Sequence, residues 1–461
     1  DEDNSNSVYQ ALNDRAISLL TEVSAAISYI GPEIINIDEA LLKSFIDKNS
    51  ELKIYSHFFN DILREKDHIL SQKEEEILAL VSEIAQAPSD IFTMLNNADI
   101  KFPSIKDENG NEIELTKGRY IRFLESNDRR VRKDAYEKLY DVYKGFQNTF
   151  ASSLSNNIKQ ERFFSNIRKY NSSLEASLSE DNVSKDVYNN LIKTVDDNLH
   201  ILHKYMSFRK KVLNLDKLCM YDIYVPLVKE PMSNIPYEDG YDIVIKALQP
   251  LGENYVNHIK EAYKSNWIDV YENKGKTSGA YSWGNYLSHP YVLLNYQGSI
   301  KDIFTIAHEM GHAMHTFYTN KTQPYIYSEY KIFVAEVASI VNEFLLTDYM
   351  IKNSKSRDEK AYLINNYLDE FRGTLFRQTM FAEFEKIVHS KASEGEALTA
   401  QGLSGVYKGL NEKYYGQAVE NDDEIAFEWA RIPHFYYNFY VFQYATGFSS
   451  AVSLSQQILK E

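Results

Sequence analysis

The sequence predicts a mainly α protein, built as one large helical body with a minor β element. Apolar residues recur at intervals of three and four through most of the 461 residues, the spacing of helices with one buried side. Strand-like patterns are confined to short stretches near residues 101–116, 221–226 and 275–297. Neither a solenoid-length repeat nor a low-complexity linker interrupts the chain.

Helical patterns fill the first hundred residues. Ser71 followed by Glu74 has the spacing of a capping box and predicts a helix start. Residues 107–111, Asp-Glu-Asn-Gly-Asn, predict a turn, within either a short hairpin or a loop excursion, after which helices resume to about residue 213. The first helix is marked by an apolar series at helical spacing: Leu12, Ala16, Leu19, Leu20 and Val23.

Glycine and aromatic residues gather in two stretches, 275–284 and 290–296. This pattern predicts a small sheet in which another backbone can approach closely. A strand here, with the backbone of Gly279, Ala280 and Tyr281, is expected to hold an extended peptide by strand addition. The alternative is a hairpin with a purely structural role.

A helix that follows this sheet carries the most informative motif. Ser299 and Asp302 predict its start, and His308-Glu309-Met310-Gly311-His312 reads H-E-x-x-H. Residues four apart lie on one face of a helix, so His308 and His312 can share a metal ion. Glu309 is then expected beside a water on that metal, as the general base of a zinc peptidase. A buried helix with two packed histidines is disfavoured, because an unused charged Glu there is costly.

A catalytic zinc requires a third protein ligand. His315 follows on the same helix and reaches the same ion poorly, so a second-shell or substrate-facing role, or a core position, is expected. The metzincin spacing would require His at 318, where this chain has Tyr318. Glu336 lies on a separate predicted helix, about 332–350, and is the better candidate. Glu343, two turns further, is expected to accept a hydrogen bond from a ligand imidazole.

Composition limits the partners and the compartment. The formal net charge of −16 disfavours nucleic acid and anionic membranes, which bind clustered Lys and Arg. No apolar run reaches the length of a transmembrane helix. The single cysteine, Cys219, cannot form an internal disulfide, which suits a reducing compartment, and a cytoplasmic location is expected. The oligomeric state is not determined by the sequence.

Several motifs together resemble the thimet-oligopeptidase-like zinc peptidases, most closely their bacterial oligoendopeptidase F branch. The resemblance spans most of the chain and is carried by H-E-M-G-H-A-M-H (308–315), F-V-A-E-V-A-S-I-V-N-E (333–343), L-F-R-Q-T-M-F-A-E-F-E (375–385) and I-P-H-F-Y-Y-N-F-Y-V-F-Q-Y-A-T-G (432–447). Family members extend further at both ends, so this chain is expected to be trimmed.

The resemblance implies a two-lobed helical metallopeptidase body with a deep channel. Residues 1–85 would form an N-terminal helical segment resembling the oligoendopeptidase F N-terminal domain, and residues 86–461 the catalytic region. It implies one zinc ion per chain, held in gluzincin fashion by His308, His312 and Glu336, with Glu309 as base. The expected activity is hydrolysis of internal bonds in short unfolded oligopeptides.

The same resemblance implies that a late segment binds the substrate carbonyl through His and Tyr. His434 matches the family His, while Tyr437, Tyr440 and Tyr444 compete for the second role; Tyr440 and Tyr444 are expected to fill it. Two rival functions remain at this point. One is a helical zinc exopeptidase, and the other is a helical binding protein without catalysis.

Overall fold

The computed structural model describes residues 2–27, 29–231 and 234–460, and it is mainly helical as predicted. The chain forms two compact units, each assembled from separate segments. Unit 1 comprises Asp1–Ile69, Glu230–Lys360 and Gly447–Glu461; unit 2 comprises Leu70–Lys229 and Ala361–Thr446. None of the helices among the described residues is both long and apolar enough to cross a lipid bilayer.

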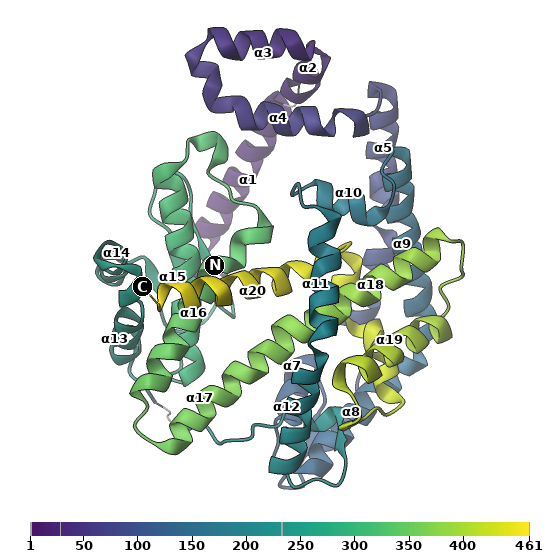
Figure 1. Cartoon of the computed structure of the whole chain (residues 1–461), viewed down its shortest axis with the longest axis vertical. Coiled ribbons are helices and arrows are strands. Elements are labelled where there is room, and N and C mark those ends of the chain that lie inside the picture. The colour runs from purple at the N-terminus through teal and green to yellow at the C-terminus, as the bar shows by residue number, and fades with distance from the viewer. Residues whose placement is uncertain (1, 28, 232–233, 461) are drawn as a thin grey trace. The chain divides into compact units, whose positions relative to one another are not determined.

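Unit 1 begins with a group of helices (Figure 1). These are α1 (Ser7–Ile27), α2 (Ile30–Asn36), α3 (Glu39–Lys48) and α4 (Ser56–Glu65), with 3-10 turns at Ser50–Tyr55 and Lys66–His68. The helical spacing near Leu12 is confirmed by α1, although Leu12, Leu19 and Leu20 stay exposed. Hence α1 is a helix whose apolar residues are accessible.

The second part of unit 1 contains α13 (Tyr237–Ala247), α14 (Glu253–Lys264), α15 (Ile300–Thr322) and α16 (Ile332–Asn353), with 3-10 turns at Gln249–Leu251 and Tyr325–Tyr327. Before α15 lies the predicted sheet, of β4 (Ile268–Asp269), β5 (Tyr281–Trp283) and β6 (Tyr291–Leu293). In its order β4-β6-β5, Ile268 pairs in parallel with Val292, and Ser282 pairs antiparallel with Val292. Strand β5, at one edge of this sheet, packs against α15.

Helices α15 and α16 pack along each other in unit 1 (Figure 1). The Ser299–Asp302 capping box starts α15 as predicted. Gly311 permits the close approach, because a Cβ atom there would lie 2.4 Å from the Ser339 Cα. The buried Asn342 side chain donates a hydrogen bond to the Ala307 carbonyl over 3.0 Å and so fixes the register of the two helices.

Unit 2 is an assembly of helices with two short sheets. Its longer helices are α5 (Gln72–Ala85), α6 (Ala87–Met94), α7 (Lys117–Leu124), α8 (Arg129–Gly145), α9 (Gln147–Ile167), α10 (Ser173–Ser179), α11 (Lys185–Asp197), α12 (Leu199–Val212), α18 (Arg377–Ser393) and α19 (Ala400–Tyr415). Helices α17 (Arg357–Glu370) and α20 (Phe442–Ile458) have residues in both units.

Shorter elements connect these helices. They are the π-helical turns Leu95–Asp99 and Phe371–Phe376, the 3-10 segments Met220–Asp222, Glu424–Arg431 and Pro433–Tyr436, and the strands β1 (Ser104–Lys106), β2 (Glu112–Glu114), β3 (Leu218–Cys219) and β7 (Val419–Glu420). The predicted hairpin is confirmed, since β1 and β2 pair antiparallel. So is the Ser71–Glu74 capping box.

One sequence prediction in unit 2 is wrong. The expected strand at 221–226 is a 3-10 turn followed by bends. The turn is held by Asp222, which accepts from the Cys219 N–H and pairs with Arg132 over 2.8 Å. Further along, residues 437–441 lie between the 3-10 turn Pro433–Tyr436 and α20.

Replacing Gly311 by Ala is expected to destabilise unit 1, because the new methyl group collides with the α16 backbone at Ser339. Overpacking of this kind costs about 1–3 kcal/mol in the free energy of unfolding. Gly405→Ala in α19 is the matched control, since nothing lies within 4 Å of its added Cβ. That change is expected to stabilise the helix by about 0.5–1 kcal/mol. Chemical denaturation of both variants measures the difference, and equal stability would contradict the close-approach argument.

Candidate active site

Three potential metal donors converge where α15 passes α16. His308 and His312 lie one turn apart on α15, and their Nε2 atoms are 3.1 Å apart. The Glu336 Oε2 on α16 lies 3.3 Å from the His308 Nε2 and 3.4 Å from the His312 Nε2. Among the described residues, these three form the group of His, Cys, Asp and Glu able to hold a metal ion.

The donor set fits zinc. Two imidazoles and a carboxylate are common ligands of catalytic zinc, with bonds of about 2.0–2.2 Å. A tetrahedral site with such bonds places its ligand atoms about 3.3–3.6 Å from one another. The observed separations of 3.1–3.4 Å therefore match three corners of a zinc tetrahedron.

Other side chains orient these donors. His308 donates from Nδ1 to the Glu343 Oε1 over 2.6 Å, which leaves Nε2 as its metal-facing nitrogen. The fully buried Ser339 donates to the Glu336 Oε2 over 3.2 Å and to the Glu336 carbonyl over 2.9 Å. Sequence reasoning identified Glu343 but missed Ser339, whose signal was its position three residues after Glu336 on one helix.

Negative charge surrounds the two histidines. Burial opposes the charged form of His308, but hydrogen bonds with Glu336 and Glu343 outweigh it and raise the pKa of His308 to about 10. Hydrogen bonds from His308 and His312 hold the pKa of Glu336 well below its ordinary value. The pocket thus favours positive charge at the position where a cation would bind.

Glu309 lies beside the donors but is not one of them. Its side chain is buried, and its Oε2 has no hydrogen-bond partner among the described residues. Burial raises the pKa of Glu309, and the nearby His308 and His312 oppose that increase. A raised pKa and an unengaged oxygen suit a group that accepts a proton and later releases it.

His315 stands apart from the metal group. Its ring stacks on Tyr330, with centroids 3.8 Å apart and planes 9° apart. Burial lowers the pKa of His315, so the imidazole stays neutral. The contact with Tyr330 was not anticipated, because no spacing in the sequence links these two residues.

The backbone expected to hold a peptide belongs to unit 1. Gly279 has φ +88°, which favours glycine, and its carbonyl accepts from the Asn295 amide over 2.8 Å. Ala280 precedes β5, which begins at Tyr281, lies at one edge of its sheet and packs on α15. The segment from Gly279 to β5 therefore lies against the helix that carries His308 and His312.

The late His and Tyr residues form an aromatic cluster in unit 2. The His434 and Tyr440 rings are nearly parallel at 15°, with centroids 6.2 Å apart, and His434 meets Tyr444 edge-on at 5.9 Å. The Tyr440 and Tyr444 rings lie 5.3 Å apart, while Tyr437 is 60% exposed. Burial lowers the pKa of His434. A neutral imidazole and two phenols are thus gathered as hydrogen-bonding groups.

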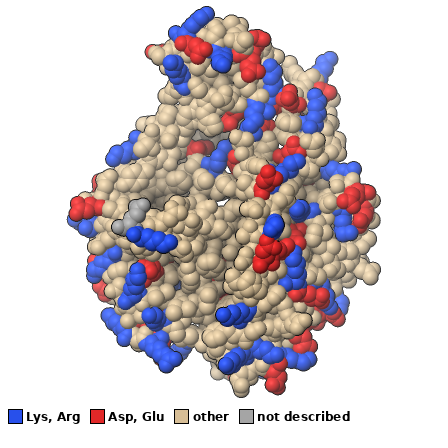
Figure 2. All heavy atoms as spheres, in the orientation of Figure 1, with Lys and Arg blue, Asp and Glu red and all other residues tan. Residues whose placement is uncertain are grey.

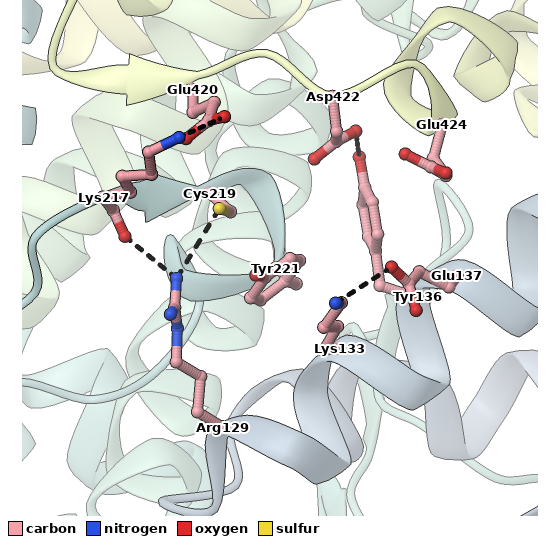
Figure 3. A pocket seen from close by; sticks show the side chains of 10 residues that line it. All are labelled: Arg129, Lys133, Tyr136, Glu137, Lys217, Cys219, Tyr221, Glu420, Asp422 and Glu424. Atoms are coloured by element: carbon pink, nitrogen blue, oxygen red, sulfur yellow. Dashed lines mark hydrogen bonds and ion pairs between the residues drawn. The ribbon is translucent and has the colours of Figure 1, made fainter.

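Unit 2 also contains a cavity of about 280 Å³ (Figure 3). Its charges pair locally, with 3.0 Å between Lys217 and Glu420, and 2.6 Å between the Tyr136 hydroxyl and Asp422. Cys219 is buried at its wall. Among the described residues, this cavity offers no converging set of metal donors.

Two protein-family models match segments of this chain. The model of peptidase family M3 matches residues 122–461, and the model described as oligopeptidase F matches residues 33–102. Oligopeptidase PepF of Bacillus subtilis is 50% identical over 461 residues, which cover 100% of this chain and 69% of that protein. An oligoendopeptidase F homolog of Lactococcus lactis is 43% identical over 463 residues, covering 100% and 76%.

Solved structures agree with these relatives. The crystal structure of oligoendopeptidase-F from Enterococcus faecium has a TM-score of 0.77 and 40% sequence identity, over 99% of this chain and 76% of that one. A crystal structure from Chlamydophila abortus reaches a TM-score of 0.94 with 38% identity, over 99% and 77%. The chain therefore belongs to peptidase family M3 and is a zinc metallo-oligoendopeptidase of the oligoendopeptidase F type.

Proposed function

We propose that this site hydrolyses internal bonds of short, unfolded oligopeptides, with His308, His312 and Glu336 holding one zinc ion and Glu309 acting as general base. The observation that carries the proposal is the buried Glu309 oxygen without a partner among the described residues, on the same helix as the two histidines. Zinc held there would acidify a water molecule and polarise the scissile carbonyl.

Glu309 is the residue that moves the proton. Its Oε2 accepts a proton from the attacking water, and its raised pKa lets it keep that proton until the leaving amine takes it. Glu343 keeps the His308 ring oriented during this cycle through their 2.6 Å hydrogen bond. Proton transfer and ligand orientation thus fall to different carboxylates.

His434, Tyr440 and Tyr444 are proposed to bind the substrate carbonyl. Their rings lie within one cluster of unit 2, and each carries an N–H or O–H donor. One well-placed donor to a developing oxyanion stabilises the transition state by about 3–4 kcal/mol. Tyr437, being exposed, is the weaker candidate.

The substrate backbone is proposed to pair with the chain from Gly279 to Tyr281 as an added strand. Support comes from the position of β5 at the outside of its sheet and from its packing on α15. Such pairing holds an extended peptide by main-chain hydrogen bonds, as an endopeptidase requires. His315, neutral and stacked on Tyr330, is proposed to line this side of the site.

Further proposals concern the substrates, the partners, the N-terminal segment and the cellular location of the protein. Names of the relatives support oligopeptides as substrates. Figure 2 shows one face of the molecule, on which Lys and Arg lie among Asp and Glu. The formal net charge of −16 supports the proposal that nucleic acid is not a partner. We also propose an N-terminal segment at residues 1–85, and a cytoplasmic location because a single cysteine suits a reducing compartment.

Glu309→Gln is expected to lower kcat by about 10²–10⁴-fold, because the amide cannot accept the proton, while zinc content stays at one per chain. Glu329→Gln, at an exposed position before α16, is the control and is expected to keep full turnover. Peptide hydrolysis and metal analysis check both variants. Normal turnover of Glu309→Gln would refute its role as base.

Zinc affinity is expected to fall as the pH is lowered from 8 to 6. The pKa of His308 is raised to about 10 in the metal-free pocket, so this residue must lose a proton to bind zinc. The zinc affinity is therefore expected to fall by up to about tenfold for each unit by which the pH is lowered. Glu343→Gln removes one charge that raises this pKa, and its affinity should depend less on pH. Competition with a chelator at each pH measures the affinity. A pH-independent affinity of the unmodified protein would contradict the assignment.

Size selection is tested with a series of peptides of increasing length beside intact casein. Short peptides are expected to be cleaved at internal bonds, whereas casein should be cleaved far more slowly. Mass spectrometry of the products, from peptides blocked at both ends, distinguishes an endopeptidase from an exopeptidase. Equal rates on casein and on short peptides would refute the proposed substrate class.

A further inference from the structure

Two consecutive residues just before Tyr440 have a left-handed backbone. Asn438 has φ 34° and Phe439 has φ 57°, in the segment between the 3-10 turn Pro433–Tyr436 and α20. This conformation is strained for a bulky residue such as Phe, and it persists only where the surrounding structure imposes it. Because Tyr440 follows directly, the turn determines in which direction its side chain leaves the backbone.

Three side chains of unit 2 form hydrogen bonds with this turn. The Phe439 N–H donates to the Glu385 Oε1 on α18 over 2.9 Å. The Asn438 amide donates to the Glu161 Oε2 on α9 over 2.9 Å. The Ser177 hydroxyl on α10 donates to the Asn438 carbonyl over 2.8 Å. The Phe439 N–H, the Asn438 side-chain amide and the Asn438 carbonyl are therefore engaged by three different helices.

The Phe439 ring adds an apolar anchor. It is 1% exposed and meets Tyr188 edge-on, with ring centroids 5.8 Å apart. His389, one turn after Glu385 on α18, lies 4.4 Å from the same ring. Helix α18 thus contacts both the backbone N–H of Phe439, through Glu385, and the ring of Phe439, through His389.

Glu385 makes no other hydrogen bond among the described residues. Its side chain is 1% exposed, and its Oε2 has no partner there. Burial raises the pKa of Glu385 to about 8, although the Phe439 N–H opposes this. A buried carboxyl group without a cation is costly to keep. Its contact with the Phe439 N–H, which would otherwise be a buried donor without an acceptor, accounts for its presence.

We propose that Glu385 is a positioning residue that holds the Asn438–Phe439 turn left-handed and thereby orients Tyr440 beside His434 toward the substrate carbonyl. This inference rests on the proposed role of His434, Tyr440 and Tyr444. Without the acceptor, the backbone at Phe439 would relax toward a negative φ and carry Tyr440 away from its near-parallel arrangement with His434.

Variants at Glu385 test whether its acceptor oxygen holds the turn. Glu385→Leu removes the acceptor and is expected to lower kcat by about 10–100-fold with little change in KM. The reason is that a displaced Tyr440 hydroxyl stabilises the transition state less. Glu385→Gln keeps an acceptor oxygen and should stay within about threefold of the parent. The control is Glu383→Leu on the same helix, which loses the hydrogen bonds that Lys413 and Tyr414 donate to Glu383. In the part of the chain that the structure describes, Glu383 makes no hydrogen bond or ion pair with Asn438 or Phe439. This control should also keep kcat.

Hydrogen–deuterium exchange of residues 437–441 reports on the turn without relying on activity. Exchange is expected to be faster in Glu385→Leu and unchanged in Glu385→Gln and Glu383→Leu. Unchanged exchange in Glu385→Leu would overturn the proposal. If Glu385→Leu does not fold, Glu385→Asp, whose carboxylate is withdrawn by one methylene, must show faster exchange and lower kcat, or the proposal fails.

The double variant Tyr440→Phe/Tyr444→Phe, assayed in parallel, distinguishes this inference from the proposed function beneath it. A slow double variant together with normal turnover of Glu385→Leu would overturn the inference alone. Full turnover of both would overturn the role of the tyrosines and the inference with it. Loss of kcat in both, with zinc content unchanged, is the result that we expect.

Discussion

The separation between α15 and α16 is the constraint on which the metal centre depends. Two donors come from α15 and the third from α16, so the distance between the helices sets the 3.3 and 3.4 Å gaps from the Glu336 Oε2 to the two imidazoles. Gly311 makes this distance possible. The hydrogen bond from Asn342 to the Ala307 carbonyl fixes the register of α16 along α15. Metal chemistry at this site is therefore a consequence of helix packing.

Two buried carboxyl groups stand out because each keeps an oxygen without a partner among the described residues. Glu309 in unit 1 faces the metal donors, and Glu385 in unit 2 binds a strained backbone turn. Burying such a group lowers stability, so its retention indicates a use. One carboxyl suits proton transfer, and the other suits the orientation of neighbouring aromatic residues.

The sequence was sufficient for the local features of the fold and the site. Helix α15, its capping box and the shared face of His308 and His312 follow from spacing within a few residues. The choice of Glu336 over His315 required a judgement about helix packing, and the geometry brings Glu336 to the imidazoles. The Asn438–Phe439 turn could not be predicted from the sequence, because no glycine marks it. The residue that accepts its hydrogen bond, Glu385, lies 54 residues earlier in the chain.

The outer position of β5 has a consequence for the range of peptides that the proposed site accepts. Strand addition engages amide and carbonyl groups that every residue shares, so it discriminates little between side chains. Proline is the exception, since it has no N–H to contribute to a ladder and its ring fixes the backbone. An enzyme that grips its substrate along β5 would thus tolerate varied sequences and would reject an imino acid at alternate positions of the bound segment.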